Sequence, residues 1–189
     1  QYFRAQLDPI SAELYDSALR TGASPDAHAT CTYTFEAGES MTSDVKDMLA
    51  VQIYRGLKAW KYDHLKDSVW STSTMYAGFQ TLSDGSGVTL YGYWGKSPYY
   101  TADLAVRRDA ALAGILSRLP AGASRIVTLQ IFYDALCDMG TYDSIAVSAA
   151  TAADSERFYY AHSSLGILLN GTGVCESYAK SFKLLCDLA

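Results

Sequence analysis

The chain has 189 residues, of which 49% are hydrophobic and 19% charged, and this is the composition of an ordinary globular protein. Its formal net charge is −5 and its lysines and arginines are not clustered, which argues against a nucleic-acid-binding protein. No apolar run approaches the roughly 20 residues that a membrane-spanning helix needs, so we expect no membrane span.

The first part of the sequence predicts a helix, a strand and a longer helix. A short amphipathic helix is expected over 12–20, and a strand over 30–35 alternates threonine with larger side chains. Helix-capping residues at 42–44 then begin a helix that extends to about residue 60, with apolar side chains at helical spacing.

A β-hairpin is the clearest local prediction. The segments 68–76 and 88–94 have the composition of strands, and the turn-forming residues 84–87 (Asp-Gly-Ser-Gly) separate them. Helices combined with this antiparallel pair indicate an α+β fold.

The second half of the sequence predicts helices joined by turns. In chain order we expect a helix over 102–119 ended by Pro120, a helix over 124–139, a loop over 142–154, a short helix within 156–169, a turn at 170–173 and a helix from about 174 to the end. We place the division of the chain at residue 120, with an N-terminal α+β region over 1–120 and a second region over 121–189.

The four cysteines show no zinc-ligand spacing and no CxxC motif. Cys137 and Cys186 lie among apolar helical positions, so we expect both to be small buried hydrophobic residues. Because the three histidines are also scattered, the sequence predicts no metal site and no cofactor.

Cys175 is the candidate with chemical consequences. It falls in the first turn of the last helix, where unpaired N–H groups and the helix dipole favour a thiolate. N–H groups of the same turn, at Gly173 and Val174, are candidates to stabilise an oxyanion, and a glycine at 173 lets a substrate backbone approach closely. A purely structural interpretation is compatible with this one: Cys175, Ala179, Phe182 and Cys186 form one apolar helix stripe.

The segment from Leu165 to Ala179 resembles the nucleophile segment of bacterial transglutaminase-like cysteine enzymes. It contains Gly173-Val174-Cys175-Glu176-Ser177-Tyr178-Ala179, which is similar to the family pattern "GVC-E-G-YA". Phe182 and Leu184-Leu185 match the aromatic residue and the leucine pair that follow in the family.

Two earlier blocks agree in order and separation. Residues 133–136 (Tyr-Asp-Ala-Leu) with 141–143 (Thr-Tyr-Asp) resemble the "HDYL…tYD" segment of the family. Residues 62–64 (Tyr-Asp-His) ahead of Trp70 resemble its "DHPE..W" region. The resemblance therefore covers most of the chain, and 121–189 corresponds to the start of a transglutaminase-like core that ends with its first core helix.

The resemblance implies acyl transfer or amide hydrolysis on protein or peptide substrates, through a thioester and a papain-like Cys-His-Asp arrangement. Cys175 matches the nucleophile, whereas the family's His and Asp follow that helix, so we expect them beyond Ala189. Two positions depart from the pattern: Ser177 stands where a glycine is usual and Tyr133 where a histidine is common.

Other partners for the cysteine come from within the chain. His162 is the nearest histidine in sequence, although a surface or helix-capping role explains it better. The best-placed carboxylates are Asp134, Asp138 and Asp143, which a helix surface and a loop explain adequately. The sequence 170–172 (Asn-Gly-Thr) fits a glycosylation acceptor, and we interpret it as turn chemistry.

The competing hypothesis is a non-catalytic surface-binding or adhesion module on a degenerate transglutaminase-like fold. It is favoured by the unmatched His and Asp, by Ser177, and by the aromatic residues Tyr91, Tyr93, Trp94, Tyr99 and Tyr100. Because the sequence begins at Gln1, removal of a secretory signal is one explanation, and we expect a secreted or cell-surface protein. The sequence leaves the oligomeric state open.

Overall fold

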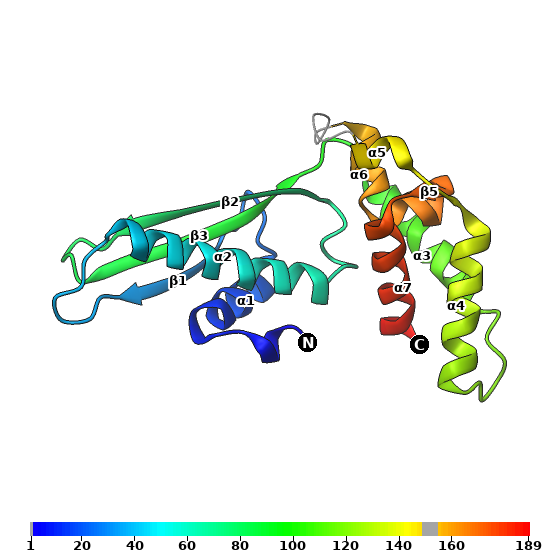
Figure 1. Ribbon diagram of the computed structural model, residues 1–189, viewed down its shortest axis with the longest axis horizontal. Helices are drawn as coiled ribbons and strands as arrows, with labels where there is room; N and C mark the ends of the chain where they lie inside the picture. The colour runs from blue at the N-terminus through cyan, green and yellow to red at the C-terminus, as the bar shows by residue number, and fades with distance from the viewer. Residues whose placement is uncertain (1, 149–154) are drawn as a thin grey trace. The chain divides into compact units, whose positions relative to one another are not determined.

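The computed structural model describes residues 2–148 and 155–189. The chain divides into two compact units, Gln1–Lys96 and Ser97–Ala189 (Figure 1). Helices together with an antiparallel three-stranded sheet confirm the predicted α+β class. Within the described ranges, no helix combines the length and the apolar character needed to cross a bilayer.

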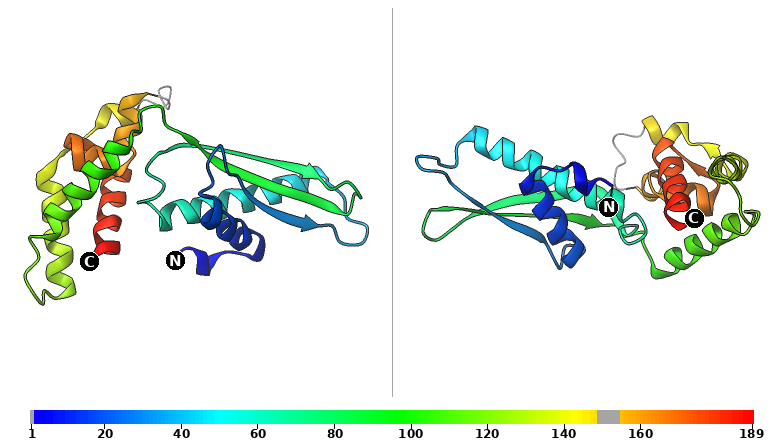
Figure 2. Two further views of the ribbon diagram at one scale, coloured as in Figure 1. Left: turned by 180° about the vertical axis from the view of Figure 1, so that it is seen from behind. Right: turned by 90° about the horizontal axis from the view of Figure 1, so that it is seen from below.

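The first unit contains the sheet and two long helices. Its elements are η1 (Arg4–Gln6, a 3₁₀ turn), α1 (Pro9–Thr21), β1 (Ala29–Thr34), α2 (Ser43–Asp63), β2 (Ser71–Thr81) and β3 (Gly87–Lys96). The strand order is β1-β3-β2, and both pairs are antiparallel (Figure 2).

Side-chain caps begin both helices of the first unit. The Asp8 carboxylate accepts a hydrogen bond from the Ser11 amide at 2.9 Å, and Pro9 occupies the first helical position of α1. Thr42 caps α2 through the Val45 amide at 3.3 Å. These are the start signals that the sequence displays, so the predicted helices are confirmed.

The core of this unit lies between the two helices and one face of the sheet. Its largest buried side chains are Leu14, Tyr15, Leu49, Ile53, Leu57, Trp60, Val88, Leu90 and Trp94. A glycine lets α2 lie close to the sheet: a Cβ placed on Gly92 would lie 2.6 Å from Leu57 Cδ1 and 2.8 Å from Ile53 Cγ2. Helix α2 is therefore packed directly on the central strand.

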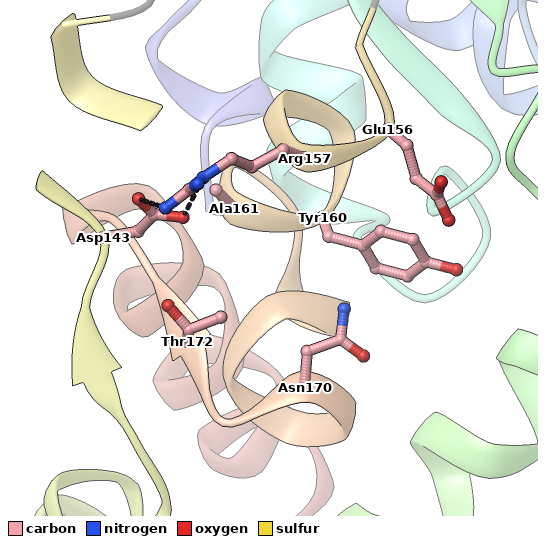
Figure 3. Close-up of a pocket in the computed structure, with 7 residues that line it drawn as sticks. All are labelled: Asp143, Glu156, Arg157, Tyr160, Ala161, Asn170 and Thr172. Atoms are coloured by element: carbon pink, nitrogen blue, oxygen red, sulfur yellow. Dashed lines mark hydrogen bonds and ion pairs between the residues drawn. The ribbon is translucent and has the colours of Figure 1, made fainter. Parts of the chain in front are cut away.

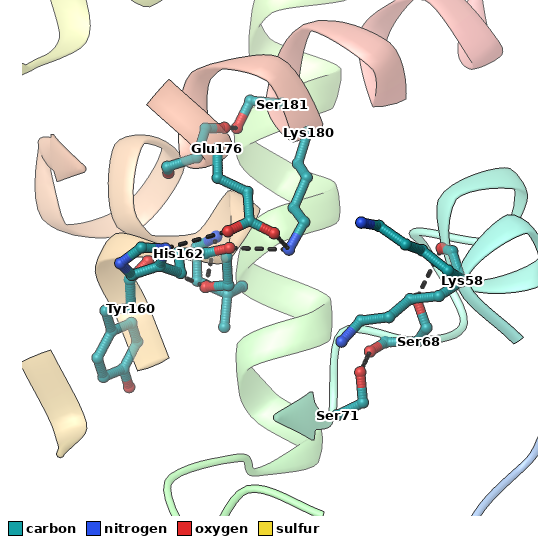
Figure 4. Close-up of polar contacts among 12 residues, drawn as sticks. Lys58, Ser68, Ser71, Tyr160, His162, Glu176, Lys180 and Ser181 are labelled. Carbon is teal, nitrogen blue, oxygen red and sulfur yellow. Dashed lines mark hydrogen bonds and ion pairs between the residues drawn. The ribbon is translucent and has the colours of Figure 1, made fainter. Parts of the chain in front are cut away.

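The predicted hairpin forms, but its first strand is shifted along the chain. The strand β2 begins at Ser71, not at 68, because the preceding residues still close the end of α2. The Ser68 hydroxyl donates to the Lys61 carbonyl oxygen at 3.2 Å, and the Ser71 hydroxyl donates to the Ser68 carbonyl oxygen at 2.7 Å (Figure 4).

The second unit is almost entirely helical. Its elements are α3 (Ala102–Leu116), α4 (Arg125–Met139), β4 (Thr141–Tyr142), α5 (Ser144–Ser148), α6 (Glu156–Ala161), η2 (Gly166–Asn170, one π-helical turn), β5 (Thr172–Gly173) and α7 (Cys175–Leu188). The helices α4 and α7 pack against each other. Buried side chains fill the interior, among them Leu104, Leu112, Ile115, Phe132, Leu136, Leu165, Ile167, Leu184 and Leu185.

The loop predicted over 142–154 is wrong in its described part. Thr141 and Tyr142 pair in parallel with Thr172 and Gly173, and α5 follows immediately. Its first turn is capped by Asp143, whose carboxylate accepts from the Ala146 amide at 2.9 Å. A two-residue strand such as β4 depends on a partner that is distant in sequence, so no local sequence pattern predicts it. Residues 149–154 of the predicted loop lie outside the described residues.

The compact units divide between Lys96 and Ser97, whereas the division expected at residue 120 marked the start of a transglutaminase-like core. Helix α3 belongs to the second unit because its buried face, with Leu112 and Ile115, packs against η2 and α7. The assignment of 121–189 to a transglutaminase-like core stays a prediction.

Candidate functional site

Cys175 is the first residue of α7, as the sequence predicted. The preceding residue, Val174, is extended (φ −94°, ψ 177°), and its amide donates to the Ala161 carbonyl oxygen at 3.0 Å. No side chain caps this helix start. The amides of Ser177 and Tyr178 turn back to the Val174 carbonyl oxygen, at 2.9 and 3.4 Å. The exposed thiol of Cys175 therefore lies at an uncapped helix N-terminus.

The turn before the cysteine is fixed by internal packing. Gly171 takes the left-handed conformation (φ 63°) that ends η2, which confirms the predicted turn. Gly173 is buried, and a Cβ at this position would lie 2.6 Å from Ser177 Cβ. The absence of a side chain at residue 173 therefore lets Gly173 pack against Ser177. The N–H of Val174, one of the predicted oxyanion donors, donates to the Ala161 carbonyl oxygen.

Ser177 stands where the family pattern has glycine, and it is fully buried. Its hydroxyl oxygen accepts a hydrogen bond from the Ile167 amide at 3.1 Å, which ties α7 to η2. One turn later the buried Ser181 hydroxyl lies near two carbonyl oxygens, that of Ser177 in its own helix at 2.8 Å and that of Ser164 before η2 at 3.3 Å. Serine in place of the family's glycine therefore changes the buried side of the first turn of α7, and the Cys175 thiol lies on the exposed side.

A groove of about 430 Å³ lies beside Cys175, between α4 and α7. Its lining residues are Tyr133, Leu136, Cys137, Cys175, Tyr178, Ala179 and Phe182. The Tyr178 hydroxyl donates to the Gly140 carbonyl oxygen at 3.1 Å, so its ring is held across the end of α4. A hydrogen bond with Cys137 raises the pKa of Tyr133, the residue at the family's histidine position. No sequence pattern predicted that α4 forms one wall of this groove.

The expectation that Cys137 and Cys186 are buried is wrong, because both are exposed. On α4 the buried face is occupied by Phe132, Ala135 and Leu136, and on α7 by Leu184 and Leu185. Each cysteine is adjacent in sequence to a buried residue, and the 100° turn per residue moves it off that face. Cys31 in the first unit is the buried one, and desolvation raises its pKa to about 12.

Glu176 and Lys180 connect the first turn of α7 to α6 (Figure 4). The Glu176 carboxylate lies 2.7 Å from Lys180 Nζ and 3.0 Å from His162 Nδ1, and Lys180 Nζ also donates to the His162 carbonyl oxygen at 2.8 Å. Burial alone would raise the pKa of Glu176, but the positive charge of Lys180 and the hydrogen bonds from Lys180 and His162 lower it below its ordinary value. The i,i+4 spacing of Glu176 and Lys180 was a visible signal for half of this network.

His162 belongs to this network and is not among the residues that line the groove. Because an ionised carboxylate only accepts hydrogen bonds, Nδ1 carries the proton that points to Glu176. The ring stacks on Phe158 with centroids 3.9 Å apart, and its buried Nε2 has no hydrogen-bond partner within the described residues. The structure thus places His162 at the C-cap of α6, directly after Ala161, and outside the groove lining.

Asp143, one of the carboxylates that the sequence singled out, is buried and forms an ion pair with Arg157 that no sequence pattern predicted. Arg157 donates two hydrogen bonds to its carboxylate, at 2.7 and 3.0 Å, and these bonds, with that from the Ala146 amide, lower the pKa of Asp143 (Figure 3). A pocket of about 290 Å³ lies next to this ion pair, lined by Asp143, Glu156, Arg157, Tyr160, Ala161, Asn170 and Thr172. Asp134 accepts from Gln130 at 2.7 Å on the exposed face of α4, and Asp138 is exposed on the same helix.

The remaining histidines belong to the first unit. His28 is exposed and stacks on Tyr93 with centroids 4.3 Å apart. His64 follows the last residue of α2, and its Nε2 lies 3.1 Å from the buried Tyr15 hydroxyl. In the part of the chain that the structure describes, no group of three or more His, Cys, Asp or Glu side chains is arranged to hold a metal ion.

Comparisons with protein-family models, with curated proteins and with solved structures find no match to this chain. The transglutaminase-like assignment therefore depends on the sequence blocks around Cys175, Tyr133 and Tyr62, and it stays a prediction.

Proposed function

We propose that Cys175 is the nucleophile of an acyl-transfer or amide-hydrolysis reaction on protein or peptide substrates. The observation that carries the proposal is the position of its thiol, exposed at the uncapped N-terminus of a 14-residue helix and in the wall of a groove. A helix N-terminus favours the thiolate form that attacks carbonyl groups.

In the proposed reaction the thiolate sulfur attacks the substrate carbonyl carbon, and the carbonyl π electrons move to oxygen. Collapse of this intermediate breaks the C–N bond, and the leaving amine takes a proton from a general acid. The product on the enzyme is a thioester at Cys175. Water then gives a carboxylic acid and a second amine gives a new amide, each with release of the thiol.

The oxyanion donors have candidates at this helix start, whereas the general base has none in the groove lining. The amides of Ser177 and Tyr178 donate to the Val174 carbonyl oxygen, whereas the amides of Cys175 and Glu176 come earlier in the first turn of the helix. The amides of Cys175 and Glu176 are our candidates for stabilising the oxyanion. The general base is absent from the groove lining, and His162 is bound to Glu176. The resemblance implies a His and an Asp that follow the nucleophile helix in the family, and the residues that line the groove supply neither.

A trapped thioester tests the proposal. The chain is incubated with an activated acyl ester, and the adduct is located by intact mass and peptide mapping. We expect one acyl group on Cys175 that hydroxylamine removes, and none in a Cys175→Ser variant under the same conditions. Acylation spread evenly over Cys137, Cys175 and Cys186 would contradict the proposal, because all three thiols are exposed.

The alternative is a non-catalytic binding module, and one observation favours it. The rings of Tyr76, Tyr93 and His28 form a stacked row on the sheet, with centroids 5.1 and 4.3 Å apart. Aromatic rows of this kind bind carbohydrate or peptide ligands in some proteins, and in others they only stabilise strand pairing. A secreted or cell-surface location, which either function would suit, stays a prediction.

A further inference from the structure

The groove beside Cys175 has an uncharged lining. None of the seven residues that form it carries a carboxylate, an ammonium or a guanidinium group. Its volume of about 430 Å³ lies within the range of small-molecule sites, which are roughly 300–1,000 Å³ and mostly apolar. A charged group placed here would lose its hydration and gain no ionic partner from the lining.

The walls of the groove are held by contacts outside it. Leu136 is buried in α4, and the Phe182 ring packs edge-to-face on Phe132 with centroids 6.4 Å apart. The hydrogen bond from Tyr178 to Gly140 fixes the third side. Tyr133 and Ala179 are exposed and so form the accessible rim. The groove is therefore formed before any ligand enters.

The charged side chains next to the nucleophile are engaged on another element. Glu176 and Lys180 bond to each other and to His162, the C-cap residue of α6, and neither of them lines the groove. The Cys175 thiol thus borders an apolar surface, although the residue that follows it carries a charge.

We propose that this groove receives an uncharged aromatic or long aliphatic side chain of the substrate, adjacent to the carbonyl group that Cys175 attacks. This inference rests on the proposed function and adds the substrate class to it. Tyr133, Tyr178, Ala179 and Phe182 are the residues that determine the preference.

Alkylation of Cys175 by three haloacetyl reagents tests the preference without requiring turnover. The reagents are iodoacetamide, N-benzyl iodoacetamide and iodoacetate, and each rate is divided by the rate of the same reagent with glutathione. For Cys175 we expect the benzyl reagent to exceed iodoacetamide by about tenfold with saturation kinetics, a gain that a filled apolar subsite commonly gives. Iodoacetate is expected to fall below iodoacetamide.

Cys186 is the internal control, because it is exposed on the same helix but does not line the groove. Its normalised rates for the benzyl reagent and for iodoacetamide are expected to be equal. Equal normalised rates at Cys175 would overturn the inference, as would a benzyl preference of the same size at both cysteines.

A pair of rim variants identifies the groove as the cause. Ala179→Lys is expected to raise the normalised rate of iodoacetate at Cys175, and Ala179→Glu to lower it, with the benzyl preference reduced in both. Asp187→Lys, at an exposed position of α7 outside the groove, is the matched control and should leave the ratios measured at Cys175 unchanged. A benzyl preference that survives both Ala179 variants would contradict the assignment to this groove.

This result is independent of the thioester experiment. Failure of acylation at Cys175 with an intact benzyl preference would reject the proposed reaction and keep the binding groove. Acylation without any reagent preference would keep the nucleophile and reject the substrate class.

Discussion

His162 Nδ1 lies 3.0 Å from the Glu176 carboxylate, so the histidine nearest in sequence to Cys175 is paired with the residue that follows the cysteine. Lys180 completes the arrangement by contacting both the Glu176 carboxylate and the His162 carbonyl oxygen. The network therefore joins the first turn of α7 to the end of α6. The other ring nitrogen of His162, Nε2, is buried, and the residue does not line the groove, so His162 is not placed to act as a base for the exposed thiol.

Replacing Glu176 tests this connection. Glu176→Gln removes the ion pair with Lys180 and weakens the hydrogen bond from His162, and we expect a loss of about 1 kcal/mol in the free energy of unfolding. The alkylation rate of Cys175 should rise a few-fold, because a negative charge that opposes the neighbouring thiolate is removed. Urea unfolding and iodoacetamide labelling measure the two effects. Glu156→Gln on α6 is the control, and an equal change there would contradict the account.

The Asp143 carboxylate should make the second unit sensitive to acid. Its pKa in the folded chain is lowered by Arg157, so its stabilising contribution is present above the unfolded value of about 3.9 and is lost as the pH falls through the folded value. Asp143→Asn is expected to lose about 1–2 kcal/mol at pH 7, since the cap of α5 and the bond to Arg157 are weakened.

The measurement for Asp143 is urea unfolding at several pH values. The difference between the natural chain and Asp143→Asn should shrink progressively as the pH falls below about 4. A difference that stays constant down to pH 2 would contradict the lowered pKa, because it would show that ionisation of the Asp143 carboxylate does not stabilise the folded chain.

Gly173 and Ser177 should behave as a coupled pair. Gly173→Ala places a Cβ 2.6 Å from Ser177 Cβ, and overpacking of this kind is expected to destabilise the chain by about 1–3 kcal/mol. Ser177→Gly, which restores the residue usual in the transglutaminase-like pattern, removes the opposing atoms. The double variant should therefore be more stable than the sum of the two single losses predicts. Additive losses in a denaturation cycle would contradict the packing described for this turn.

The four cysteines should divide into three accessible thiols and one protected thiol. Cys137, Cys175 and Cys186 are exposed, whereas Cys31 is buried and burial raises its pKa to about 12. Native labelling at pH 8 is expected to modify the first three and to leave Cys31 unmodified until urea unfolds the first unit. Mass spectrometry of the labelled peptides measures this, and rapid labelling of Cys31 in the native chain would contradict its place in the core.

Local signals account for most of the fold that the sequence predicted. Caps at Asp8, Thr42 and Ser124, and the turn before β3, define elements within a few residues of their observed bounds. The pairing of β4 with β5 was missed because Thr141 and Thr172 meet only after the chain has folded between them. Such contacts leave no trace in a local pattern.

The candidate site was predicted only in part. The position of Cys175 at a helix start followed from the turn that precedes it, whereas the exposure of Cys137 was predicted wrongly. An apolar stripe does not show which of its edges faces the core, and on α4 the edge with Leu136 is the buried one. The pair His162–Glu176 joins two helices, and nothing in either segment alone indicates it.

The central claim, that Cys175 is a reactive nucleophile, is tested most directly by its rate of alkylation with iodoacetamide between pH 5 and 9, measured beside Cys186 in the same molecule. Partial desolvation and the neighbouring Asp187 raise the pKa of Cys186 although the residue is exposed, while Cys175 lies at a helix N-terminus. The account predicts that Cys175 is labelled at least about tenfold faster than Cys186 below pH 7. Equal and slow rates for the two thiols would contradict it and would favour the non-catalytic module.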